Sequence, residues 1–379
     1  MNTNPATTSV PQVYSGEVIY LYAFDIAYEL KRDSVKTLLG CDVQQFVVDS
    51  SKRSPRHLFF YKPQMVKLPS WIRQGSHGQV QVERSVKLLS VGAISITIKV
   101  PFKDLKFEEL VDFHDLYFGN DSLTDEVRKM ADEIRKELAP HCLRPISQLA
   151  EEEAYTVFCI HSPLKDEKGE LIKAEAWYKS KRREIAALLT QEENPEMLSK
   201  QESDESTGRY LTYYEHDLVV TDWDSSLIVD KPQNMDVIVY PLELANLQLA
   251  ELEAYDRMLD DSLDRCYRDL SERRVNKKVS ILKELREIRI DMARCSDELS
   301  NITKFFGGDW HIARVYENIA NRFHLKDWHK TIDGKLATLA NMYQMLSNDH
   351  NNKLMIILEV TIVLLFVIDV IILLVPLMH

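Results

Sequence analysis

An almost wholly apolar run near the C-terminal end constrains this chain more than any other feature of its sequence. Residues 354–375 read LMIILEVTIVLLFVIDVIILLV, and Pro376 follows them. A helix of that length rises about 33 Å at about 1.5 Å per residue, and the hydrocarbon core of a bilayer is about 30 Å thick. The run therefore predicts a single transmembrane helix over residues 353–376 that anchors the rest of the chain. The alternative is a helix buried in a protein core.

Two acidic residues, Glu359 and Asp369, interrupt the apolar run. Each costs about 2.5–3.5 kcal/mol near a bilayer centre, and they lie about 80° apart around a helix. They predict a contact with a partner helix or with a second copy of this one. The alternative is that the carboxylates reach the headgroups or are protonated.

Charge and cysteine usage predict the compartment. Lys353 precedes the apolar run and no basic residue follows it, which favours a body on the cytoplasmic side of the cell inner membrane; the matrix-facing mitochondrial inner membrane is the alternative. The cysteines are odd in number, without a CxxC pair, and fit a reducing compartment. They are Cys41, Cys142, Cys159, Cys266 and Cys295. The net charge of −12 argues against non-specific binding of nucleic acid by the whole body, and we expect no specific DNA binding.

Helical periodicity dominates residues 232–352. One segment alternates steps of four and three over about four heptads, which is typical of a coiled-coil seam. The seam residues are Ile281, Leu285, Ile288, Met292, Cys295, Leu299, Ile302 and Phe306. A second helix, near the end of this region, has the same steps at Ile332, Leu336, Leu339, Tyr343 and Leu346. Two such helices predict an antiparallel coiled-coil hairpin within the chain; a coiled coil between chains is the alternative.

Strands and helices mix without a βαβ rhythm in residues 17–231, which predicts an α+β domain after a disordered tail over residues 1–16. The clearest strand is residues 91–100, which we expect Pro101 to end. A helix is predicted over residues 122–138. The polar and acidic residues 192–206 predict a flexible loop.

The last third of the chain resembles a known family. The segments DWHIARVYENIANRF, GKLATLANMYQMLSNDHNNKL and MIILEVTIVLLFVIDVIILL are similar to the end of the required-for-meiotic-nuclear-division, or YagE-like, family. Leu358-Glu359 and Asp369 match that family's paired acids. The resemblance implies a membrane-bound oligomer without known catalytic chemistry, whose mitochondrial members are linked to translation.

Signatures of catalysis are weak. No phosphate-binding glycine loop, HExxH or GxSxG motif occurs. Histidines 311, 324 and 329 match no standard metal-ligand spacing. Asp217, Asp222 and Asp224 could pair as general acid and base, but acids that cap turns are commoner. We therefore expect no enzyme, no metal and no cofactor.

A basic helix is the remaining candidate site. Its side chains predict a contact with anionic lipid or ribosomal RNA, and a solvated helix face is the alternative. They are Arg273, Arg274, Lys277, Lys278, Lys283, Arg286 and Arg289.

These features together predict a non-enzymatic, membrane-anchored scaffold or tether that forms a homo-oligomer and presents an α+β body to a protein or ribosomal partner. One alternative is an accessory subunit of an oligomeric membrane complex, assembled through the acidic transmembrane helix. The other is a hydrolase at the membrane surface.

Overall fold

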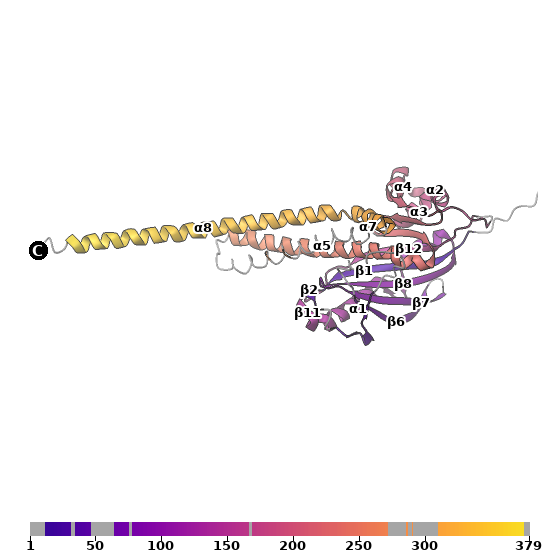
Figure 1. Cartoon of the computed structure of the whole chain (residues 1–379), viewed down its shortest axis with the longest axis horizontal. Coiled ribbons are helices and arrows are strands. Elements are labelled where there is room, and N and C mark those ends of the chain that lie inside the picture. Colours follow the sequence, from indigo (N-terminus) through magenta and orange to yellow (C-terminus); the bar gives the residue numbers. More distant parts are fainter. Residues whose placement is uncertain are drawn as a thin grey trace, which may run out of the picture. The chain divides into compact units, whose positions relative to one another are not determined.

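The computed structural model describes residues 12–31, 35–46, 64–75, 78–166, 169–271, 286, 290 and 310–374. The chain divides into two compact units, one of residues 1–253 and 298–326 and the other of residues 254–297 and 327–379. The described residues make a mixed α+β structure with a large sheet in the first unit (Figure 1).

Nine strands of the described residues form that sheet, in the order β13-β14-β15-β12-β1-β8-β7-β6-β5. β12 pairs with β15 in parallel, and the other neighbours are antiparallel. The strands are β1 (Tyr14–Asp25), β5 (Gln44–Gln45), β6 (Gln64–Gly75), β7 (Gly78–Leu88), β8 (Ala93–Leu105), β12 (Glu153–His161), β13 (Tyr210–Leu211), β14 (Leu218–Thr221) and β15 (Ser225–Asp230). Three short two-stranded pairings accompany it: β2 (Ala27–Leu30) with β11 (Cys142–Pro145), β3 (Thr37–Leu38) with β4 (Cys41–Asp42), and β9 (Tyr117–Phe118) with β10 (Asp121–Ser122).

Alternating side chains divide the sheet into two faces. Along β8, Ile94, Ile96 and Ile98 point into the main hydrophobic core, while Ser95 and Thr97 point to the opposite face. Helices on the core side bury their apolar stripes there. They are the 3-10 helix η2 (Phe107–Phe113), α1 (Leu123–Leu138), α2 (Ala174–Ser180) and α3 (Arg182–Leu189).

Two further helices contact the sheet within the first unit, one of them only with its first part. Asn246 of α5 (Met235–Ser271) donates to the carbonyl of Glu153, 2.9 Å away, and α7 (Trp310–Arg322) lies along β14. The 3-10 turns η3 (Ala139–His141), η4 (Pro195–Met197) and η5 (Pro232–Asn234) and helix α4 (Lys200–Thr207) connect these elements.

Two predictions for the first unit need correction. β8 continues through Pro101 to Leu105, because the ladder with β7 ends at Lys99 and the missing N–H of a proline is tolerated on that open side. Residues 192–206 are not a loop throughout, since they contain η4 and most of α4. The hydroxyl of Ser199 caps α4 by accepting from the backbone N–H of Glu202 at 3.0 Å.

The predicted transmembrane helix over residues 353–376 is wrong. No helix among the described residues is long and apolar enough to cross a membrane. Residues 354–374 are the end of α8 (Leu325–Leu374), and the acid-free stretch between Glu359 and Asp369 rises only about 14 Å. The tail-anchored, single-pass architecture and the placement in a cell or mitochondrial inner membrane are overturned with it.

His114 makes the stability of the first unit depend on pH. Its Nε2 lies 2.6 Å from the carbonyl oxygen of Leu188, and its ring meets the ring of Phe158 at 4.9 Å. Burial lowers the pKa of His114 below its ordinary value of 6.5. Protonation is therefore less favourable in the folded than in the unfolded chain, so the free energy of unfolding should fall as the pH drops below about 6.5.

Urea unfolding at about pH 7.5 and about pH 5.5 tests this dependence. We expect the wild type to lose more stability between the two conditions than His114→Gln, whose amide can still donate to Leu188 but does not titrate. An equal loss in both proteins would show that His114 does not contribute.

Candidate functional site

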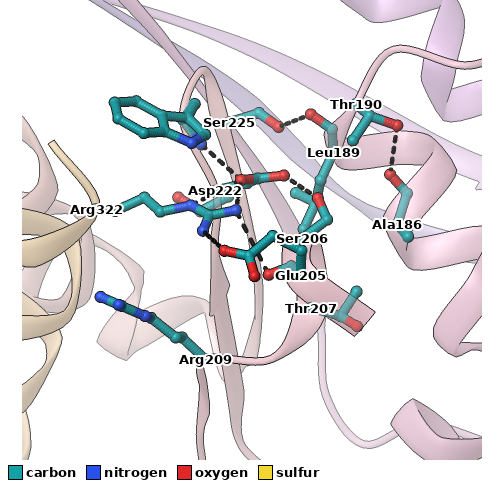
Figure 2. A network of polar contacts seen from close by, with 12 residues as sticks. Ala186, Leu189, Thr190, Glu205, Ser206, Thr207, Arg209, Asp222, Ser225 and Arg322 are labelled. Carbon is teal, nitrogen blue, oxygen red and sulfur yellow. Dashed lines mark hydrogen bonds and ion pairs between the residues drawn. The ribbon is translucent and has the colours of Figure 1, made fainter. Parts of the chain in front are cut away.

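A buried ion pair joins three elements of the first unit. Arg322, the last residue of α7, donates from Nε to Oδ1 of Asp222 at 2.9 Å and from Nη2 to the same oxygen. Its Nη1 donates to Oε1 of Glu205, on α4, at 2.9 Å. Figure 2 shows Arg322 reaching from its helix between these two acids. Arg322 is 6% exposed and Asp222 is 4% exposed, so the pair is shielded from water.

Further donors surround the Asp222 carboxylate (Figure 2). The hydroxyl of Ser206 donates to its Oδ2, and the backbone N–H of Trp223 donates to its Oδ1 at 2.9 Å. The phenol of Tyr155 donates to the backbone carbonyls of Asp222 and Ser225 at 3.0 and 2.8 Å. Both the carboxylate and its backbone are therefore fixed by hydrogen bonds.

Burial and charge act in opposite directions on this pair. Burial raises the pKa of Asp222 above its ordinary value, and the Arg322 guanidinium opposes that rise. Burial alone would lower the pKa of Arg322, but its hydrogen bonds to Asp222 and Glu205 leave that pKa raised. The guanidinium stays charged, and the carboxylate beside it has its acceptor positions occupied. This geometry suits a clamp between the β14–β15 turn, α4 and α7 better than a proton-transfer site.

A second buried pair lies between the sheet and α5. Lys87 of β7 donates to Glu243 of α5, whose other carboxylate oxygen accepts from Ser95 at 2.6 Å and from Thr97 at 3.3 Å. The Lys87 ammonium also lies 4.4 Å from the centre of the Phe46 ring. Lys87 and Glu243 are 9% and 4% exposed. Ser95 and Thr97 alternate with the isoleucines of β8 because their hydroxyls donate hydrogen bonds to the buried carboxylate of Glu243 on α5.

The second unit carries an exposed apolar surface on α8. We call residues 354–371 the apolar segment of α8. All its described side chains are exposed, and its large apolar ones are between 42% (Ile368) and 68% (Phe366) exposed. Figure 1 shows this part of α8, in yellow, continuing past the end of α5. A helix that is apolar on every side is normally covered, so this segment is a candidate docking surface.

The predicted site residues are placed as follows. Glu359 and Asp369 are exposed on the apolar segment, and their predicted contact inside a membrane is overturned with the transmembrane helix. Arg286 is described as helical and exposed. The other six basic residues, Arg273, Arg274, Lys277, Lys278, Lys283 and Arg289, lie outside the described residues. So do all eight predicted seam residues, Ile281, Leu285, Ile288, Met292, Cys295, Leu299, Ile302 and Phe306.

The histidines considered as metal ligands have aromatic neighbours. His311 lies 5.3 Å from the ring of Tyr213, and His324 lies 5.3 Å from the ring of Trp223. Within the part of the chain that the structure describes, no three His, Cys, Asp or Glu side chains gather as a metal site would require.

The fold and these pairs define an α+β domain stabilised by buried ion pairs and followed by long helices. Residues 15–236 match the model of a family described as "Uncharacterized protein MJ0711, N-terminal domain", and the chain belongs to that family. The matched span holds the strands from β1, except its first residue, to β15 and includes Asp222, whereas Arg322 and α8 lie beyond it. The resemblance to the required-for-meiotic-nuclear-division family is therefore wrong.

One curated relative shows how far this similarity reaches. The chain is 26% identical over 222 residues to "Uncharacterized protein MJ0711" of Methanocaldococcus jannaschii, across 58% of this chain. The match spans 65% of the relative's length, slightly less than two thirds. No solved structure matches this chain.

Proposed function

We propose that this chain is a non-catalytic assembly protein, in which helix α8 docks a helical protein partner and thereby holds the α+β body within a complex. The apolar segment of α8 carries the proposal. A Leu, Ile or Val side chain contributes about 1.5–3 kcal/mol when it is fully buried. The segment offers many such side chains at about half exposure, so covering it would be strongly favourable.

The shape of the surface favours a helix as the partner. The segment belongs to one continuous helix, Leu325–Leu374, and presents side chains at steps of three and four residues rather than an open sheet edge. Amphipathic helices recognise such a face through anchors at i, i+3, i+4 and i+7.

The buried acids of the α+β body support a non-catalytic role. Asp222 is engaged by Arg322 and Ser206, and Glu243 by Lys87, Ser95 and Thr97. Carboxylates in such pairs are poor candidates for general acid or base, because proton transfer would leave a buried arginine or lysine without its counter-charge.

Hydroxyl-radical footprinting of the full-length protein, isolated under mild conditions, tests the proposal. Leu364 and Leu171 are 57% and 63% exposed in the isolated chain. If a partner covers the apolar segment, Leu364 should oxidise several-fold more slowly than Leu171, which lies outside α8. Ile357, at 60% exposure, should be protected with Leu364. Equal oxidation of the two leucines would show that the segment is uncovered, and the proposal would fail.

A further inference from the structure

One stripe of α8, apolar except at His350 and Lys353, runs from the interior of the second unit into its exposed segment. Steps of four and three residues begin at Ile332, Leu336 and Leu339 and continue in the same register to Ile357 and beyond. The intervening positions of the register are Tyr343, Leu346, His350 and Lys353, and the last ones are Val360, Leu364, Val367 and Ile371. Apolar positions repeated at these steps are typical of a helix face that packs against another helix.

The first part of the stripe is already used within the second unit. Ile332 and Leu339 are 0% exposed and Leu336 is 4% exposed. Between them, Lys335 bridges to Asp256 and Asp260 of α5 at 2.7 and 2.6 Å. This part of α8 therefore packs as one helix of an intrachain pair.

The last part of the stripe keeps the same register, but its side chains are exposed. Ile357, Val360, Leu364, Val367 and Ile371, which we call the distal seam, are between 49% and 60% exposed. The described part of α5 ends at Ser271. α5 covers the first part of the stripe. The distal seam continues the same row of side chains past the end of the described part of α5.

The two acids of the segment lie away from the distal seam. At about 100° per residue, Glu359 is about 120° and Asp369 about 160° from the centre of the seam. Both carboxylates can therefore remain in water while the seam is buried. A partner that bound the acids through basic side chains would have to dock on the other side of the helix.

We propose that the occupant of the distal seam is the distal seam of a second copy of this chain, so that the protein is a homo-oligomer joined through α8. This inference rests on the proposed docking role of the apolar segment. An identical helix supplies a matching row of apolar side chains in the same three-and-four spacing, and two copies can pair without bringing their acids into the interface. Apolar residues flanking the seam, such as Val363 and Ile368, allow more than two copies to assemble.

Sedimentation analysis of the full-length protein across a range of concentrations tests this inference. We expect a mass of at least two chains and a dissociation constant that rises at least about tenfold in Leu364→Glu. Phe366→Glu is the matched control, because Phe366 is equally exposed in the single chain but lies on the side opposite the seam. We expect it to change the dissociation constant less than about threefold.

A cysteine substitution gives an independent measurement that does not depend on weakening the assembly. Leu364→Cys should form a disulfide-linked pair of chains under mild oxidation, and Phe366→Cys should do so far less. A single-chain mass with no Leu364→Cys cross-linking would overturn the inference. If Leu364 of the wild type is nevertheless protected from oxidation, the docking role stands with a different protein as partner; if it is not, both proposals fail.

Discussion

Replacing Arg322 with methionine is expected to destabilise the first unit by about 3–5 kcal/mol. Methionine fills much of the same space but leaves the Asp222 carboxylate, 4% exposed, without its counter-charge. It also removes the donor to Glu205, so the contact from α7 to α4 is lost. Urea unfolding followed by tryptophan fluorescence would measure the change.

Two comparisons make the Arg322 result specific. Arg209→Met changes an exposed arginine shown nearby in Figure 2 and should alter stability by less than about 1 kcal/mol. Adding Asp222→Asn to Arg322→Met should restore part of the loss, because a neutral amide is less unfavourable to bury than an unpaired carboxylate. If Arg322→Met were no more harmful than Arg209→Met, the clamp would be refuted and Asp222 would return as a candidate for proton transfer.

Replacing Trp177 with alanine is expected to destabilise the first unit by a similar amount, about 3–5 kcal/mol. Trp177 is 1% exposed, and its ring meets those of Tyr14 and Phe107 edge-on at 5.9 and 5.7 Å. Its Nε1–H donates to the hydroxyl of Tyr14 at 3.0 Å. Burial raises the pKa of Tyr14 to about 12, so its hydroxyl keeps its proton near neutral pH. In Trp177→Ala this buried hydroxyl loses the indole N–H that donates to it.

Trp223 is the matched control for Trp177, since it is the same residue type at 50% exposure. Its ring contacts are with His324 and, at 5.8 Å, with the Arg322 guanidinium. Trp223→Ala should therefore lower stability by no more than about 1 kcal/mol. Equal losses in the two variants, measured by thermal unfolding, would contradict the assignment of Trp177 to the core.

Local patterns predicted several elements close to where they lie. The helix expected over residues 122–138 is α1, Leu123–Leu138, because its apolar spacing and the Ser122 cap agree. Its cap is visible as the hydroxyl of Ser122 accepting from the N–H of Asp125 at 3.1 Å. Composition gave the wrong prediction for residues 192–206, because tertiary contacts hold part of this polar segment as a helix. α4 has three acids among its eight residues and no apolar residue, yet Ser206 and Thr207 are buried. The Ser199-to-Glu202 spacing was the available signal of a helix.

The candidate site was harder to predict than the fold. Asp222 was considered from sequence as a catalytic acid, but its partner Arg322 lies 100 residues away along the chain. Nothing local marks an arginine at a helix end as the partner of a particular acid, because folding alone brings them together. The apolar run over residues 354–375 was recognised, but hydropathy alone led to the wrong prediction of a transmembrane helix. The register that joins it to Ile332 depends on knowing that α8 is one helix.

The parallel pairing of β12 with β15 affects how this protein emerges from the ribosome. β12 ends at His161 and β15 begins at Ser225, with α2, α3 and α4 between them. At about 5–20 residues per second, β15 follows β12 by roughly 3–13 s. Throughout that interval one edge of β12 has backbone N–H and C=O groups without their native partner, and such an edge can pair with a neighbouring nascent chain. The time for which this edge of β12 stays open is therefore set by the speed of translation through residues 162–224.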